Sequence, residues 1–137
     1  RHFTHEIGPS IQSALLAASP QDSHHDEIVV QVQSWIHSNY HQEVRNEDLA
    51  ELANMSIRNL TRRFKKATQT SPSAYLRNTR LEEARALLRD SNATIIEIGD
   101  LVGYRDASHF IDAFKTHTNS TPGEYRRLVR AKVFSAT

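Results

Sequence analysis

The stretch Ser71–Asp90, SPSAYLRNTRLEEARALLRD, decides the fold, because it predicts one uninterrupted helix. Pro72 suits a first helical turn, where a missing N–H is no loss, and the Ser71 side chain before it can cap the helix. Apolar residues recur along it at helical spacing: Leu81, Ala84, Leu87 and Leu88. The other faces are charged. At 1.5 Å per residue such a helix spans roughly 25–30 Å, so it can join two separate units.

The segments on either side of this helix look like copies of each other. With an offset of fifty residues, Leu60 aligns with Phe110, and the Phe-Lys pair at 64–65 aligns with that at 114–115. Both copies end in Ser/Thr-Pro-x-x-Tyr. Before the turn inside each copy the offset is forty-nine, so the second turn is one residue longer. The repeat favours a duplicated structural unit over an accidental likeness, although two helical hairpins without a ligand remain the alternative.

The first copy begins with a predicted helix from residue 26 to about 40. Its apolar residues share one helical face: Ile28, Val32, Trp35 and Ile36. A short helix over 47–53 follows, with acidic residues in its first turn, where the helix dipole favours them. A turn at 54–56 leads to a helix from 57 to about 67, which Ser56 caps. Two short helices joined by such a turn are typical of a helix-turn-helix unit.

The second copy repeats this order. Thr94 and Glu97 form a capping box, and the apolar side of the helix that follows consists of Ile95, Ile98, Leu101 and Val102. Asp106 can cap a helix from 107 to about 118, and a final helix is expected from 124 to about 133. The large aromatic residues of both copies have apolar neighbours at helical spacing, which places them in the core: Trp35, Phe64, Phe110, Phe114 and Tyr125.

The sequence therefore predicts an all-α fold of two helix-turn-helix subdomains joined by a long linker helix. The expected segments are a linker or remnant of a preceding domain at 1–26, the first subdomain at 27–70, the linker helix at 71–90, and the second subdomain with a C-terminal tail at 91–137. The chain begins with Arg rather than Met, so we expect it to be a piece of a longer protein.

Composition narrows the possible functions. The chain has no cysteine, which excludes a disulfide scaffold, a thiolate zinc site and a catalytic thiol. No apolar run reaches the length of a membrane span. We expect no enzyme and no cofactor, because no catalytic set or glycine-rich phosphate loop is evident. His37 and His41 are four residues apart but lack an evident carboxylate or thiol partner, so they predict a surface pair rather than a metal site.

The net charge of +1 conceals an asymmetry. Residues 1–43 hold one Arg and five acidic residues, whereas residues 44–137 hold sixteen Lys and Arg against eleven acidic residues, a net charge of +5. A basic body favours a polyanionic partner such as nucleic acid. An ordinary solvated surface is the alternative that charge alone leaves open.

Several motifs of this chain resemble the AraC-type regulators. They are Ser56-x-x-x-Leu60-x-Arg62-x-Phe64-Lys65-Lys66, Ser71-Pro72-x-x-Tyr75-Leu76, Arg80-Leu81-x-x-Ala84-x-x-Leu87-Leu88, Ile98-Gly99-x-x-Val102-Gly103-Tyr104-x-Asp106-x-Ser108-His109-Phe110-x-x-x-Phe114-Lys115 and Pro122-x-x-Tyr125-Arg126. The resemblance covers about residues 28–127. It implies a cytoplasmic bacterial transcription regulator that binds double-stranded DNA, with the third helix of each subdomain in the major groove.

The same resemblance suggests what lies outside this chain. The stretches SIRNLTRRF and GYRDASHF look like the subset of the family with an amidotransferase-like (PfpI-type) N-terminal domain. A small-molecule effector, if the regulator has one, would then bind in that missing domain. Activators of this type also touch RNA polymerase, which is therefore an expected second partner.

The chain departs from the family pattern at several positions. Arg45 stands where Ser or Thr usually caps the helix over 47–53, so we expect Asn46 to cap it instead. Gly99 replaces the usual Ala, at a modest cost in helix propensity. Asp112 stands where many members place Arg on the second recognition helix.

Base-facing residues of a recognition helix are expected to be polar, to lie in its N-terminal half and to recur three or four apart. On the first such helix they are Arg58, Asn59, Thr61 and Arg62, which match the family's base-facing positions. Arg58 or Arg62 can bind O6 and N7 of a guanine, worth about 1–3 kcal/mol of discrimination. A phosphate contact is the alternative for any one Arg. The second helix presents a set that is poor in basic groups: Ala107, Ser108, His109, Ile111 and Asp112.

We therefore expect the first subdomain to supply most guanine readout and the second to read shape and apolar features. Ile111 can touch a thymine methyl, and Asp112 can accept from cytosine N4. Phosphate contacts are assigned to Ser56, Arg63, Lys65, Lys66, Arg105 and Lys115. The two recognition helices should lie about 34 Å apart and enter successive major grooves. The competing function is a protein-interaction module that docks acidic partners such as RNA polymerase subunits. Salt dependence separates the two, because DNA binding should weaken steeply with ionic strength through counterion release.

Overall fold

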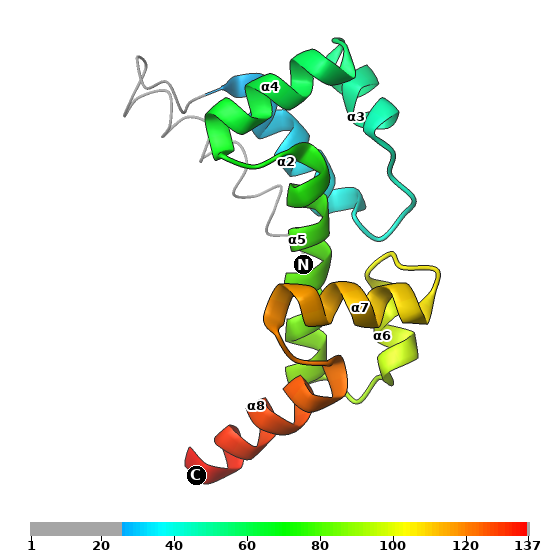
Figure 1. The fold of residues 1–137 in the computed structure, drawn as a ribbon, viewed down its shortest axis with the longest axis vertical. Coiled ribbons are helices and arrows are strands. Elements are labelled where there is room, and N and C mark those ends of the chain that lie inside the picture. The colour runs from blue at the N-terminus through cyan, green and yellow to red at the C-terminus, as the bar shows by residue number, and fades with distance from the viewer. Residues whose placement is uncertain (1–25, 137) are drawn as a thin grey trace. The chain divides into compact units, whose positions relative to one another are not determined.

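The computed structural model describes residues 26–136, and Figure 1 shows them as helices joined by turns. Within that range there are seven helices and no strands. They are α2 (Glu27–Asn39), α3 (Asn46–Ala53), α4 (Ile57–Thr68), α5 (Pro72–Asp90), α6 (Ile95–Leu101), α7 (Ala107–Thr118) and α8 (Pro122–Ala136). The predicted all-α fold is confirmed. The linker or domain remnant expected at 1–26 lies outside the described residues, apart from Asp26.

The described residues form two compact units. The first comprises 26–40 and 44–76, and the second comprises 41–43 and 77–136. Helix α5 contributes its residues up to Leu76 to the first unit and the rest to the second. Each unit contains one helix pair joined by a turn, α3 with α4 and α6 with α7.

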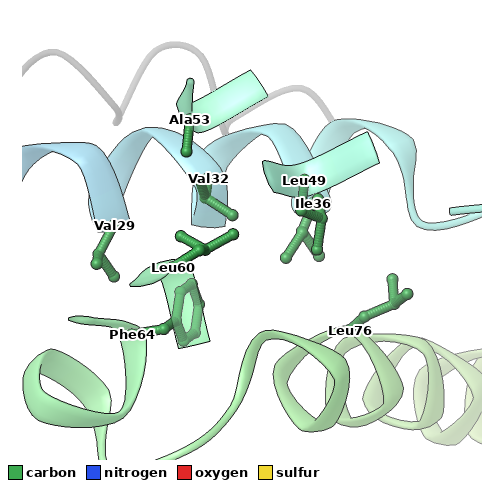
Figure 2. Packing of buried hydrophobic residues seen from close by; sticks show 8 residues of the cluster. All are labelled: Val29, Val32, Ile36, Leu49, Ala53, Leu60, Phe64 and Leu76. Atoms are coloured by element: carbon green, nitrogen blue, oxygen red, sulfur yellow. The ribbon is translucent and has the colours of Figure 1, made fainter. Parts of the chain in front are cut away.

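The first unit is built around one apolar core. Figure 2 shows eight of its side chains converging from α2, α3, α4 and α5. They are Val29, Val32, Ile36, Leu49, Ala53, Leu60, Phe64 and Leu76. The expected Trp35 is only partly buried and packs against the edge of this cluster. Full burial of a large apolar side chain contributes roughly 1.5–3 kcal/mol, so these few residues hold the four helix segments together.

The second unit has an equivalent core with more aromatic residues. Leu81, Ala84 and Leu88 of α5 are fully buried, as the apolar stripe predicted, whereas Leu87 is half-buried. Phe114 of α7 lies with its ring centroid 6.0 Å from that of Phe110 and 5.5 Å from that of Tyr125 on α8.

The expectation that Leu101 faces this core is wrong, because its side chain is 54% exposed. At about 100° of helix rotation per residue, Val102 falls about 40° to one side of the buried Ile98. Leu101 falls about 60° to the other side, away from the core.

Most helix starts are capped as the sequence predicts. The Ser56 hydroxyl accepts from the Asn59 N–H at 3.0 Å, and the Ser71 hydroxyl accepts from the Ala74 N–H at 3.1 Å. In the capping box, Thr94 accepts from the Glu97 N–H at 3.1 Å, and Glu97 accepts from the Thr94 N–H at 2.8 Å. Asp106 caps α7 by accepting from the Ser108 N–H at 2.9 Å.

Two helix starts differ from the expectation. The assignment of Asn46 as a cap is wrong, because α3 begins at Asn46 itself and Arg45 occupies the cap position. Arg45 has no acceptor in its side chain, and its N–H donates instead to the Asp48 carboxylate at 2.9 Å. Asn46 accepts from the Ser73 hydroxyl at 2.9 Å. Helix α8 begins earlier than expected, at Pro122, where Thr121 and Glu124 form another capping box.

The second helix of each pair, α4 and α7, ends in the same way in the two copies. Gln69 after α4 and Asn119 after α7 both have left-handed backbones, with φ of 64° and 67°. One residue earlier, the Thr68 hydroxyl donates to the Phe64 carbonyl at 2.8 Å, and the Thr118 hydroxyl donates to the Phe114 carbonyl at 2.9 Å. The repeat seen in the sequence therefore extends to individual hydrogen bonds.

One pair of core positions differs between the copies in a compensating way. A Cβ on Gly99 would lie 2.9 Å from Cδ2 of Phe110, closer than packed atoms allow. The aligned positions of the first unit hold Ala50 and Leu60, both buried. The copy with the larger residue on the second helix of its pair therefore has the smaller residue on the first helix.

Candidate nucleic-acid interface

Helix α4 buries two large apolar side chains on one side and exposes two of its arginines on the other. Leu60 and Phe64 are 2% and 0% exposed, whereas Arg58 and Arg62 lie on the exposed surface. Asn59 and Thr61, the other two predicted base-facing residues, are half-buried. Because the buried Leu60 and Phe64 fix the rotation of the helix, they also fix which side Arg58 and Arg62 present to a ligand.

Arg62 is oriented by a neighbour on its own helix. Its Nη2 donates a short hydrogen bond to Oδ1 of Asn59, one turn earlier. This contact leaves further N–H groups of the guanidinium to donate elsewhere, since Arg carries five. Asn59 therefore acts as a support for Arg62 in the free protein, a role that sequence spacing alone did not assign to it.

Helix α7 presents a different surface. Ser108, His109 and Asp112 are exposed, and Ala107 and Ile111 are half-buried. The His109 ring packs edge-on against the buried Tyr104 ring, with centroids 5.2 Å apart. This contact limits the rotamers of His109. The predicted base-facing set of α7 is thus accessible but holds no Lys or Arg.

The residues assigned to phosphate contacts are either exposed lysines or side chains that already have a partner in the fold. Lys65, Lys66 and Lys115 are exposed near the C-terminal ends of α4 and α7. Ser56 already uses its hydroxyl to cap α4. Arg105 donates to Glu43 at 2.8 Å, but both side chains are largely exposed, so this pair adds little stability.

Arg63 has a structural partner that sequence reasoning missed. Its Nε and Nη2 donate to the two carboxylate oxygens of Asp26, at 3.0 and 2.9 Å. The same carboxylate caps α2 by accepting from the N–H groups of Ile28 and Val29. Arg63 therefore ties the start of α2 to the recognition helix within the first unit. No sequence signal links the two, because they are 37 positions apart.

These contacts set the ionisation of Asp26. Burial raises the pKa of Asp26, but the hydrogen bond and charge of Arg63 and the two backbone N–H groups outweigh it. The net result is a pKa below the usual 3.8, so the carboxylate stays ionised at neutral pH.

An open groove of about 530 Å³ lies along α7 in the second unit. One wall consists of His109, Asp112, Ala113, Thr116 and His117 of α7. The other wall consists of Arg77 and Asn78 of α5. These two α5 residues were not among the predicted DNA-facing residues, because they lie outside both helix-turn-helix pairs. The sequence did show that both are polar residues on the charged side of the long helix, and this could have marked them as surface residues.

Other potential sites are weak among the described residues. The His37 ring nitrogen Nε2 lies 2.7 Å from the Tyr75 hydroxyl, and residues 26–136 contain no group of three His, Asp or Glu side chains placed to hold a metal. Over the same range, no helix combines the length and the hydropathy that crossing a membrane requires.

The comparisons with known proteins agree with this geometry. A protein family described as "Helix-turn-helix domain" matches residues 49–128. The transcriptional activator NphR of Rhodococcus sp is 34% identical over 122 residues, which cover 88% of this chain and 36% of that protein. The transcriptional activator RhaS of Salmonella newport is 33% identical over 105 residues, covering 77% of this chain and 38% of that protein. The chain thus spans little more than a third of these relatives.

Solved structures give the same assignment. The C-terminal domain of AraT, a response regulator of Geobacillus stearothermophilus, has a TM-score of 0.73 at 32% identity and covers 75% of this chain and 86% of its own. The DNA-binding domain of AdpA, solved in complex with a target DNA, has a TM-score of 0.74 at 29% identity, with coverages of 78% and 96%. An AraC-type regulator of Chromobacterium violaceum has a TM-score of 0.68 at 32% identity, with coverages of 73% and 89%. This chain belongs to the AraC-type helix-turn-helix family of transcription regulators.

Proposed function

We propose that this chain is the DNA-binding part of a bacterial transcription regulator and that it places α4 and α7 in successive major grooves of double-stranded DNA. The observation that carries the proposal is the surface of α4, where Arg58 and Arg62 are exposed opposite the buried Leu60 and Phe64. The DNA complex of the related AdpA domain supports the same ligand class for this chain. Its relatives are transcription regulators rather than enzymes.

The two helices differ in what they can read. In our proposal Arg58 and Arg62 donate to O6 and N7 of guanines, while Thr61 offers a hydroxyl and a methyl group. On α7, Ile111 contacts a thymine methyl and Asp112 accepts from cytosine N4. Lys65, Lys66 and Lys115 face phosphates. Most of the guanine specificity then lies in the first unit.

One experiment tests both the function and its geometry. The chain is used to select bound sites from random duplex DNA at a stated salt concentration, and the selected site is then footprinted. We expect protection of two successive major grooves on one face, with centres about 34 Å apart. Affinity should fall steeply with salt because each phosphate contact releases counterions. A footprint confined to one groove, or binding that is insensitive to salt, would contradict the proposal.

We further propose that this module works within a longer cytoplasmic regulator. The likeness of SIRNLTRRF and GYRDASHF to one subset of the family favours an amidotransferase-like (PfpI-type) N-terminal domain, in which an effector would bind. RNA polymerase is the proposed protein partner, with an acidic surface of one of its subunits facing the basic side of this chain. The coding sequence upstream of residue 1 tests the first point, and a pull-down of polymerase subunits at low and high salt tests the second.

A further inference from the structure

The second recognition helix is poor in positive charge where it is proposed to face bases, because its one basic residue, Lys115, lies near its C-terminal end. Between Ala107 and Phe114 it holds no Lys or Arg, and it carries the exposed Asp112 among its base-facing residues. A carboxylate at that position repels the phosphates that line any groove the helix enters. A compensating cation is therefore expected beside α7, on a neighbouring element.

The groove along α7 places such a cation there. His109, Asp112 and Thr116 follow one another at helical spacing along one wall, and Arg77 lines the facing wall together with Asn78. Arg77 comes from α5, so its position relative to α7 is set by the buried core of the second unit rather than by the recognition helix. A strand of DNA that follows the His109–Asp112 side of α7 would pass along this groove and meet the guanidinium of Arg77.

Arg77 is also less committed to the fold than its neighbours Arg80 and His117. Its side chain is exposed, and no carboxylate within residues 26–136 forms an ion pair with it. Arg80, one turn along α5, donates to the Gln42 carbonyl at 2.7 Å and lies over the Tyr104 ring at 5.7 Å. His117, at the far end of the groove, is hydrogen-bonded to Glu82 at 3.1 Å.

We propose that Arg77 of the linker helix binds a DNA phosphate next to the base edges that α7 reads, and so offsets the repulsion from Asp112. This inference rests on the proposed DNA-binding function. It adds a contact from an element outside both helix-turn-helix pairs. The contact is to the backbone rather than to a base, because Arg77 lies across the groove from the base-facing residues.

The test compares two charge-removing variants of the same helix. Arg77→Gln removes the proposed contact, and Arg89→Gln is the matched control, since Arg89 is an exposed α5 residue paired with Asp90 at 2.9 Å. Affinity of the whole chain for its selected site and for a scrambled duplex is measured over a range of salt concentrations. Circular dichroism confirms that each variant keeps its helix content.

We expect Arg77→Gln to weaken binding about tenfold on both duplexes and to reduce the slope of log K against log salt by about 0.9, the value for one lost phosphate contact. Arg89→Gln should leave the slope unchanged. The inference is overturned if the slope of Arg77→Gln equals that of the wild type, or if its loss of affinity is confined to the selected site. Failure of the proposed function would look different, because the wild-type chain would then not prefer its selected site over the scrambled duplex.

Discussion

The two recognition helices, α4 and α7, share a scaffold but differ in charge. Each has twelve residues, begins at a capped residue, buries two large apolar side chains and ends in a left-handed residue. Yet α4 carries five Lys and Arg, and α7 carries one. Residues of a helix that face the core and residues that face solvent occupy different sides, so each set can change without disturbing the other. The pair therefore shows how one duplicated fold can carry two surfaces of unlike charge.

The largest expected effect concerns the shared scaffold. Phe64→Ala and Phe114→Ala remove aligned, fully buried rings, and each should destabilise its own unit by about 3–5 kcal/mol. Hydrogen–deuterium exchange followed along the sequence measures this for each unit separately. We expect faster exchange within 26–40 and 44–76 for the first variant and within 77–136 for the second. An equal rise across both units in either variant would show that they unfold together.

The next effect concerns the difference in charge. Arg62→Ala should cost about 1–3 kcal/mol of discrimination against a changed guanine in the selected site, because a bidentate contact is lost. Asp112→Ala should cost less, since it removes one acceptor and also a phosphate-repelling charge. Competition binding with single-base variants of the site gives both numbers. A greater loss of specificity in Asp112→Ala would reverse the assignment of guanine readout to the first unit.

A smaller effect concerns the compensating core pair. Gly99→Ala gains helix propensity, but its Cβ meets Phe110, so we expect a net destabilisation of about 1 kcal/mol or more. Combining it with Phe110→Leu reproduces the pair found at Ala50 and Leu60. Thermal unfolding of the two single variants and the double variant gives their coupling, expected at about 0.5–3 kcal/mol in favour of the double variant. Strict additivity would mean that the two positions are not in competition for space.

The smallest effect concerns the tie between α2 and α4. Asp26→Asn keeps an oxygen to cap α2 but removes the charge opposite Arg63, which is partly exposed, so we expect a loss of about 1 kcal/mol or less at pH 7. The folded pKa of Asp26 is lowered, so its stabilisation is present above the unfolded pKa and is lost as the pH falls through the folded value. The difference between wild type and variant should therefore shrink from about pH 5 downward.

The control for this prediction is Asp100→Asn, an exposed carboxylate on α6 in the other unit. Chemical denaturation from pH 7 to pH 3 follows both variants. A gap between wild type and Asp26→Asn that stays constant down to pH 3 would show that the stability difference does not come from the charge of Asp26.

The sequence predicts interactions between residues that are close together in the chain better than interactions between distant residues. Ser56, Ser71, Thr94 and Asp106 were predictable as caps because each bonds to a backbone group two or three residues away. Helical spacing likewise predicted the buried Phe64, Phe110 and Phe114, whereas Trp35 and Tyr125, expected in the core as well, are only partly buried. Leu101 was placed wrongly because a seven-residue helix offers too little repeat to decide between two neighbouring faces.

The candidate site was less predictable because its residues come from different elements. The base-facing residues of α4 and α7 follow from spacing and family likeness, and their contacts with DNA remain a prediction. The Arg63–Asp26 pair and the groove shared by Arg77 and α7 depend on how separate helices pack. The spacing of residues along one helix cannot predict which residues of another helix will contact it.

The unequal pairs Ala50 with Leu60 and Gly99 with Phe110 also constrain the order in which the two halves could have diverged after duplication. Starting from alanine and leucine, a change to phenylalanine first would force a ring against a methyl group. A change to glycine first would leave only a small void, which a later phenylalanine could fill. If the first unit keeps the ancestral pair, the second unit once had glycine and leucine at these positions. That intermediate would have contained a small packing void and still have folded.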